Sequence, residues 1–161
     1  MSNIFKSSIG RKIAMALSGI FLIVFLMQHF LINITSVFSE EIFNMLSHFM
    51  GNNPLVQFIL QPVLIAGVLF HFVMGFVLEW QNRKARPVTY AMYKGSRNSM
   101  FVSRNMIISG IVILSFLALH FYDFWVPEMD YKYIKSLPED PNRYYEELIH
   151  KFENPVRVGL Y

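Results

Sequence analysis

The chain has 161 residues, of which 54% are hydrophobic and only 16% are charged, whereas a soluble domain usually carries about 25% charged residues. This composition excludes an ordinary soluble domain. Because the chain has no cysteine, disulfides, thiolate metal sites and iron–sulfur clusters held by this chain are excluded as well. The formal net charge is +3, but the basic residues do not gather on one soluble face, so we expect no nucleic-acid partner.

The first apolar run covers residues 13–38 and contains no Asp, Glu, Lys or Arg. It is longer than the roughly 20 residues that a helix needs to cross a bilayer, and we predict a transmembrane helix. Three basic residues precede the run, as in a signal peptide. The apolar stretch nevertheless far exceeds the about 7–15 residues of such a peptide, so we expect the helix to remain in the mature protein.

Two further apolar runs predict transmembrane helices over residues 55–81 and 104–126. Pro54 stands where a helix start tolerates proline, and Pro62 predicts a kink in the first half of the second helix. Pro127 is expected to stop the third helix. The predicted fold is therefore an all-α membrane protein with three transmembrane helices, and the lipid bilayer is its main surrounding.

The segment after the third helix is polar and predicts a short helix over residues 142–152 that packs on the outer surface. Residues 155–161 read as the start of a fourth helix, so we expect that a C-terminal part is missing from this chain. We treat residues 1–161 as a single membrane-anchor domain.

Charge predicts the orientation of these helices. The N-terminal segment and the loop over residues 83–104 together hold nine Lys or Arg and no acidic residue, with Glu79 just before the loop, whereas the opposite side holds five Lys or Arg and ten acidic residues. By the positive-inside rule, the N-terminus and this loop are cytoplasmic. The first and third helices then run outward, and the second runs inward.

Three of the five histidines, His29, His71 and His120, lie inside the apolar runs. An imidazole in hydrocarbon needs a hydrogen-bond partner or a metal, so each of them indicates a functional site. The alternative is that each histidine forms a hydrogen bond to a neighbouring helix. One histidine on each of three helices makes that alternative weaker.

The level of each histidine in the membrane follows from the helix rise of about 1.5 Å per residue. His29 lies roughly 24 Å from the cytoplasmic end of its helix, His120 roughly 21 Å and His71 only about 14 Å. His29 and His120 therefore share an outer level, as two axial ligands of one haem must. His71 lies at an inner level and lacks a partner in this chain.

Small residues stand near these histidines. Gly67 and Gly75 flank His71 at four residues on either side, which places them on its helical face and leaves room for a porphyrin. Alternatively, they allow close helix packing, as small residues often do in membranes. Ser18 and Gly19 precede His29 by eleven and ten residues, again on its face, and Ser109 and Gly110 precede His120 by the same spacing.

Two histidine ligands would leave haem iron without an open position, which favours electron transfer over oxygen chemistry. The haem propionates would need basic or hydroxyl partners. The candidates near the inner level are Arg83, Lys84, Arg97, Ser103 and Arg104.

Five segments together resemble a known family, the single-chain, two-haem cytochrome b membrane anchor of succinate:quinone oxidoreductases (succinate dehydrogenase and fumarate reductase), of the type found in Bacteroidetes-like bacteria. They are the run SIGRKIAMALSG with HFLIN from His29 onward, FMGNN at residues 49–53, the stretch from Gly67 to Gly75, SRNMIISG at residues 103–110, and His120. The resemblance covers essentially the whole chain.

The resemblance implies a five-helix anchor with two haems b in the bacterial inner membrane. His29 and His120 would ligate the distal haem, and His71 would ligate the proximal haem with a histidine of the fourth helix. The implied partners are an iron–sulfur subunit, a flavoprotein subunit and a membrane quinone, either menaquinone or ubiquinone. This chain departs from the family by ending before the fourth-helix histidine.

The chain would pass electrons between the iron–sulfur subunit and quinone, and it has no flavin site with which to oxidise succinate itself. Two other functions stay open: a cytochrome b subunit of another quinone-linked complex, such as a hydrogenase or formate dehydrogenase, and a haem-free structural anchor. A quinone site is expected either at an inner position near Ser18 or Ser103 or among polar residues on the outer side, namely Gln28, Asn33, Glu40, Glu41, Tyr122 and Asp123.

Overall fold

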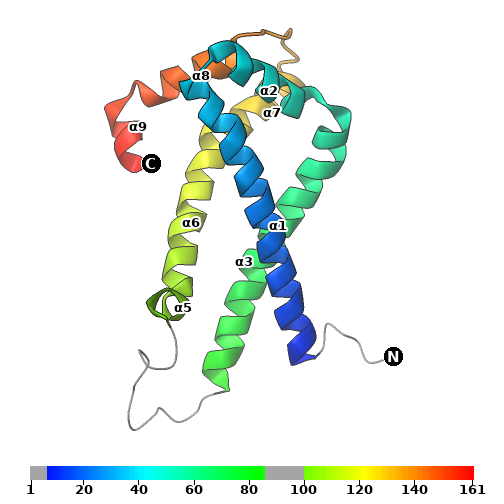
Figure 1. The fold of residues 1–161 in the computed structure, drawn as a ribbon, viewed down its shortest axis with the longest axis vertical. Helices are drawn as coiled ribbons and strands as arrows, with labels where there is room; N and C mark the ends of the chain where they lie inside the picture. The colour runs from blue at the N-terminus through cyan, green and yellow to red at the C-terminus, as the bar shows by residue number, and fades with distance from the viewer. Residues whose placement is uncertain (1–6, 86–99) are drawn as a thin grey trace.

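The computed structural model describes residues 7–85 and 100–161, apart from the side chains of Val102 and Ser103. Within these ranges the regular structure is entirely helical, with no strand. Three long helical segments form rods, which are joined at one end by shorter helices that lie across them (Figure 1). We call this end, formed by residues 39–55 and 128–154, the cap.

The first rod is α1 (Ser8–Ile34), which continues into a 3-10 turn, η2 (Thr35–Val37). The Ser7 side chain caps its start by accepting a hydrogen bond from the Gly10 amide at 2.9 Å. The cap then begins with α2 (Glu40–Asn52), where Ser39 accepts from the Ile42 amide at 3.2 Å. Serine at both N-caps satisfies amides that the first turn of a helix leaves unpaired.

The second rod joins a π-helical turn, η3 (Val56–Leu60), to α3 (Gln61–Lys84). The third rod follows the short helix α5 (Phe101–Arg104) and consists of α6 (Met106–His120), the π turn η4 (Phe121–Trp125), α7 (Val126–Met129) and the π turn η5 (Asp130–Ile134). The chain ends with α8 (Arg143–Phe152) and α9 (Pro155–Leu160).

The three predicted transmembrane helices are confirmed. Among the described residues, three helical segments are long and apolar enough to span a membrane: Ser8–Val37, Val56–Lys84 and Met106–Ile134. In the most apolar part of the first two, no residue is buried inside the chain. The apolar side chains of these helices are therefore left for lipid or for other protein surfaces to cover.

The expectation that Pro127 stops the third helix is wrong, because the rod runs on to Ile134. A proline in a helix lacks an N–H and its ring clashes with the carbonyl four residues earlier. Here the π turn η4 precedes it, and the Val126 amide donates five residues back, to the Phe121 carbonyl. The wider turn makes room for the ring, and the helix continues.

The same device surrounds Pro62, where the sequence predicts a kink. The Gln61 amide donates five residues back to the Val56 carbonyl, at the end of the π turn η3, and Pro62 follows at once. Both prolines thus occupy the same position relative to a π turn. Each of these two prolines follows a wider π-helical turn, and the helix continues past it.

Helices α1 and α3 cross each other at close range (Figure 1). A Cβ built on Gly67 of α3 would lie 2.8 Å from Cε1 of Phe21, and one built on Gly75 would lie 3.8 Å from Cε of Met15. Both glycines therefore face α1. This geometry supports the helix-packing interpretation of the two glycines.

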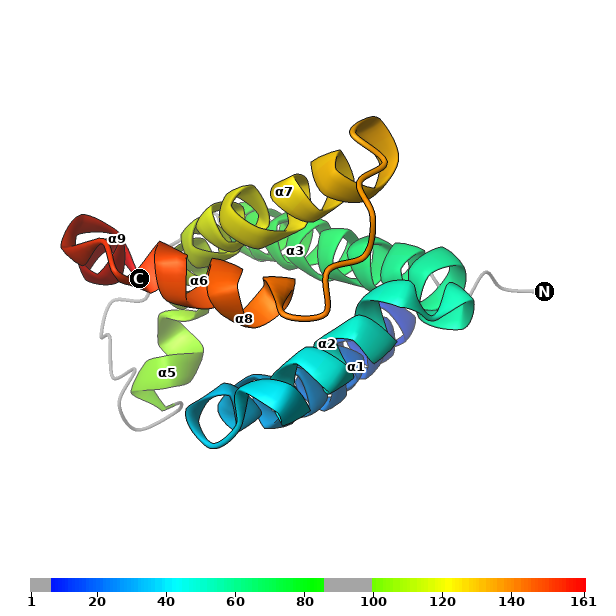
Figure 2. The same ribbon diagram turned by 90° about the horizontal axis from the view of Figure 1, so that it is seen from above.

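The cap is held by one ionic cluster. Seen from above, α2 and α8 lie across the ends of the rods (Figure 2). Glu128 accepts from the Tyr144 hydroxyl at 2.8 Å, pairs with Lys132 at 2.6 Å and also pairs with Arg143. Arg143 is only 7% exposed, and its guanidinium lies 3.9 Å from the ring centroid of Tyr131. The cluster joins α8 to the third rod.

Helix α2 is tied to the same cluster through its backbone. The Lys132 ammonium donates to the Gly51 carbonyl at 2.7 Å, and the buried Asn44 accepts from the Tyr145 amide at 2.9 Å. The described buried hydrophobic core consists of Phe43 and Val56, which lie in or beside the cap. The cap is therefore where this chain packs most tightly on itself.

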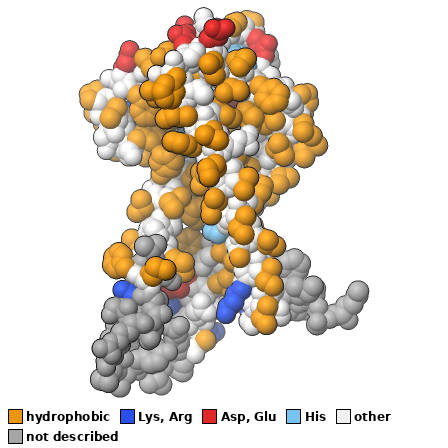
Figure 3. Space-filling model, in the orientation of Figure 1, with side chains coloured by type: hydrophobic (Ala, Val, Ile, Leu, Met, Phe, Trp, Pro, Cys, Tyr) orange, Lys and Arg blue, Asp and Glu red, His pale blue; other side chains and the backbone are white. Residues whose placement is uncertain are grey.

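Charge divides along the long axis of the molecule. In Figure 3 most acidic side chains gather over the cap, and the basic ones on the visible face lie toward the opposite end. The described basic residues at that opposite end are Arg11, Lys12, Arg83, Lys84 and Arg104. We call it the basic end.

Exchanging Gly67 for Ala tests the packing of α1 on α3. The new methyl group would overlap the Phe21 ring, so we expect the free energy of unfolding to fall by about 1–3 kcal/mol. The matched control is Gly110→Ala, because a Cβ at Gly110 meets nothing within 4 Å. The control should leave stability unchanged or raise it by up to about 1 kcal/mol through helix propensity. Equal changes in the two variants, measured by thermal unfolding in detergent, would refute the contact.

Exchanging Glu128 for Gln tests the cap cluster. Breaking this ion pair leaves the buried Arg143 with only an exposed carboxylate as its charge partner, so we expect a loss of about 3 kcal/mol. Glu147 also pairs with Arg143, at 3.0 Å, but is 41% exposed. The variant Glu147→Gln should therefore cost no more than about 1 kcal/mol. If the two variants unfold at the same temperature, Glu128 does not hold the cap.

Candidate functional site

His29 of α1 and His120 of α6 face each other in the half of the bundle nearer the cap. Their ring centroids lie 5.6 Å apart, and the ring planes are perpendicular, at 90°. The two residues come from different rods and are 91 positions apart in sequence. The structure thus places them side by side, at the common level that the helix-rise arithmetic predicts.

Aromatic rings enclose this pair. Phe25 stacks on His29 at 5.4 Å between centroids, and Phe116 stacks on His120 at 5.8 Å. Phe124 lies 5.2 Å from His120 on the following turn. Within the described residues neither imidazole forms a hydrogen bond through its ring. The surroundings are apolar, aromatic and suited to a flat hydrophobic ligand.

The spacing of the pair agrees with two imidazoles on one iron. An imidazole nitrogen coordinates a metal ion at about 2 Å, so two rings on opposite sides of one ion have centroids about 6 Å apart. The observed 5.6 Å is slightly shorter than this separation, so the two rings would move apart by several tenths of an ångström to hold an iron between them. The donor set of His29 and His120 therefore fits bis-histidine ligation of a haem, whose macrocycle supplies the remaining ligands itself.

His71 of α3 lies at a different level and has a hydrogen-bond partner on α1. Its Nδ1 lies 2.9 Å from the Ser18 hydroxyl oxygen. The same hydroxyl lies 2.8 Å from the Met15 carbonyl, to which it can donate, and its oxygen can then accept from Nδ1–H of His71. An imidazole that donates through Nδ1 keeps the Nε2 lone pair, which is what a metal ligand requires.

Ser18 and Gly19 of α1 lie at the level of His71 and not at that of His29. A Cβ on Gly19 would lie 3.4 Å from Cε1 of His71. Ser18 stands eleven residues before His29, which is about 16 Å along the helix. Ser109 turns back to the carbonyls of its own helix, and Gly110 has open space around it.

Three of the five predicted propionate partners have described side chains, and each of the three has different surroundings. Arg83 pairs with Glu79 at 2.7 Å, and the Lys84 ammonium lies 5.6 Å from the Trp80 ring centroid. Arg104 ends α5 and is exposed. Arg97 and the side chain of Ser103 lie outside the described residues. The three described cations are all at the basic end, nearer to His71 than to the His29–His120 pair.

A buried carboxylate follows the histidine pair on the third rod. Asp123, in the π turn η4, is 2% exposed. It pairs with Arg157 of α9, lies 3.9 Å from the Lys151 ammonium and accepts from the Tyr161 hydroxyl at 2.9 Å. One carboxylate thus gathers two cations and a phenol from the C-terminal residues.

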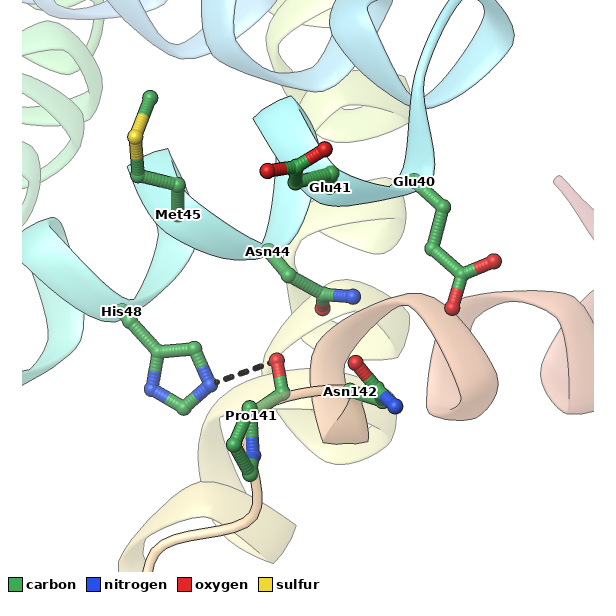
Figure 4. Close-up of a pocket in the computed structure, with 7 residues that line it drawn as sticks. All are labelled: Glu40, Glu41, Asn44, Met45, His48, Pro141 and Asn142. Atoms are coloured by element: carbon green, nitrogen blue, oxygen red, sulfur yellow. Dashed lines mark hydrogen bonds between the residues drawn. The ribbon is translucent and has the colours of Figure 1, made fainter.

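The other outer polar residues do not form one site with it. Asn33 donates to the His29 carbonyl at 2.8 Å, Gln28 contacts the Met50 sulfur at 3.5 Å, and Tyr122 is 67% exposed. An open cavity of about 430 Å³ lies between α2 and the start of α8 (Figure 4). It is lined by seven cap residues, of which the first two are quinone candidates: Glu40, Glu41, Asn44, Met45, His48, Pro141 and Asn142. A dashed line marks the bond from His48 to the Pro141 carbonyl, at 3.1 Å.

The outer quinone candidates are therefore scattered: Glu40 and Glu41 line the cavity, Asp123 is buried in its own cluster, and the other three have separate surroundings. Among the described residues, no group of three or more His, Cys, Asp or Glu side chains could hold a bare metal ion. Comparisons of this chain with protein-family models, with curated proteins and with solved structures find no match.

Proposed function

We propose that this chain is the haem b membrane anchor of a succinate:quinone oxidoreductase and passes electrons between an iron–sulfur subunit and membrane quinone. The observation that carries the proposal is the approach of His29 and His120, 5.6 Å apart with perpendicular planes, from two membrane helices. The family resemblance of the segments around His29, His71 and His120 supplies the identity of the complex.

The residues of this chain would act as ligands and as an insulating shell. A haem bound between His29 and His120 would supply reversible one-electron chemistry at its iron. His29 and His120 would hold it from opposite sides, leaving no position for oxygen. Three aromatic rings, those of Phe25, Phe116 and Phe124, would exclude water from the haem iron. A hydrophobic shell of this kind controls solvent access and the local dielectric constant, and hence the redox potential.

His71 would ligate a second haem nearer the basic end. Its Nδ1–H is held by Ser18, which fixes the ring and leaves Nε2 available. A metal-bound histidine usually donates its other ring N–H to such a partner. We propose that the second ligand of this haem is a histidine of a fourth helix, as the resemblance implies.

The orientation follows from the charges at the two ends. We propose that the basic end faces the cytoplasm of a bacterium and the acidic cap faces outward, by the positive-inside rule. The iron–sulfur and flavoprotein subunits would then dock at the basic end, close to His71. Electrons would pass from the level of His71 to that of His29 and His120, or in reverse.

Histidine variants of the purified complex test the ligand assignment. We expect His29→Ala and His120→Ala to remove the same haem b component from the reduced-minus-oxidised spectrum and His71→Ala to remove a different one, because the two levels hold separate haems. The control His48→Ala changes a cap histidine bonded to the Asp140 and Pro141 carbonyls and should leave both components.

Three outcomes would contradict parts of the proposal. Loss of one shared component in His29→Ala and His71→Ala would refute the pairing. No haem b in the wild-type complex would leave a haem-free structural anchor as the function. Haem that hydrogen or formate reduces, but succinate does not, would assign the chain to another quinone-linked complex.

A further inference from the structure

The carboxylate of Asp123 lies beside the proposed haem ligand His120, yet ligation does not use it. It stands three residues after His120 on the same rod, and its side chain is fully buried. A carboxylate in that position costs solvation free energy unless cations compensate it. Arg157 and Lys151 provide the compensation. The cluster therefore places one buried anion and two partly exposed cations one helical turn from the histidine pair.

A continuous set of contacts connects this cluster to His120. The Tyr161 hydroxyl donates to Asp123, and the Tyr161 ring packs edge-on against Phe116 at 5.6 Å. Phe116 stacks on the His120 imidazole with an angle of 12° between the planes. On the other side, Phe124 contacts both His120 and Phe152 of α8. Aromatic rings fill the space between the charges and the histidine, so water screens these charges weakly.

We propose that Asp123 and Arg157 set the redox potential of the haem held by His29 and His120. The inference rests on the proposed function. A ferric haem with two neutral imidazoles carries one more positive charge than the ferrous form. The Asp123 carboxylate stabilises the ferric form and lowers the potential, and the Arg157 guanidinium does the opposite. The potential depends on the balance between them.

The redox step at the haem transfers a single electron. One electron from an external reductant converts ferric to ferrous iron, and no bond forms or breaks. Because no proton is needed, the two variants below change only the fixed charge near the iron. The side chains of Lys151 and Tyr161 are the same in both variants.

A potentiometric titration of the haem spectrum in the purified complex tests this inference. Asp123→Asn removes the anion and should raise the midpoint potential. An expected tenfold change in the ratio of reduced to oxidised haem at a fixed applied potential corresponds to about 59 mV for one electron. Arg157→Gln removes a cation and should lower the potential. Glu146→Gln, an exposed change of the same charge on α8, is the control and should leave it unchanged.

Opposite shifts distinguish an electrostatic role from a structural one, since loosening of the site would move both variants in the same direction. Shifts of the same sign, or none, overturn the inference while the haem spectrum still supports the proposed function. If Asp123→Asn does not assemble with haem, the result for Arg157→Gln decides: an unchanged or raised potential overturns the inference. A wild-type complex without haem refutes the proposed function itself.

Discussion

Two carboxylates on the third rod attach the polar segments of this chain to its membrane helices. Asp123 gathers Arg157 and Tyr161 near α9, and Glu128 gathers Arg143 and Tyr144 of α8. The most apolar parts of the membrane helices bury almost nothing inside the chain, and the buried hydrophobic core of the described residues is only Phe43 and Val56. Ion pairs in a partly dehydrated setting are directional, and they hold the cap on the side of the bundle where His29 and His120 meet.

The π turn before Pro127 carries one of these two carboxylates. A straight α-helix could not accommodate Pro127 in its interior without losing contacts to the preceding turn. The π turn η4, Phe121–Trp125, lets the helix pass the proline, and it carries Asp123 while His120 ends the helix just before it. Irregular turns of this kind often mark functional positions in helices. Here the turn adjoins both the proposed haem ligand and the buried carboxylate.

Much of this architecture is readable from the sequence, because a run of apolar residues without charges has few solutions other than a membrane helix. The level shared by His29 and His120 follows from helix rise alone. Three features do not follow. Helix α2 was not predicted, although Ser39 with two glutamates after it is an N-cap signal. The contact of Ser18 with His71 depends on how α1 crosses α3, and residue spacing does not determine that crossing. The continuation of the third rod past Pro127 depends on a π turn, which residue spacing does not predict either.

The central claim is that His29 and His120 hold one haem between them, and that their imidazole planes keep the perpendicular arrangement of this structure. Perpendicular planes leave two iron orbitals close in energy, which makes the magnetic signal of the ferric ion strongly anisotropic. The electron paramagnetic resonance spectrum of the oxidised complex measures this directly. We predict a strongly anisotropic low-spin ferric signal that His120→Ala abolishes. Absence of any low-spin ferric haem signal, or its persistence unchanged in His120→Ala, would contradict the claim.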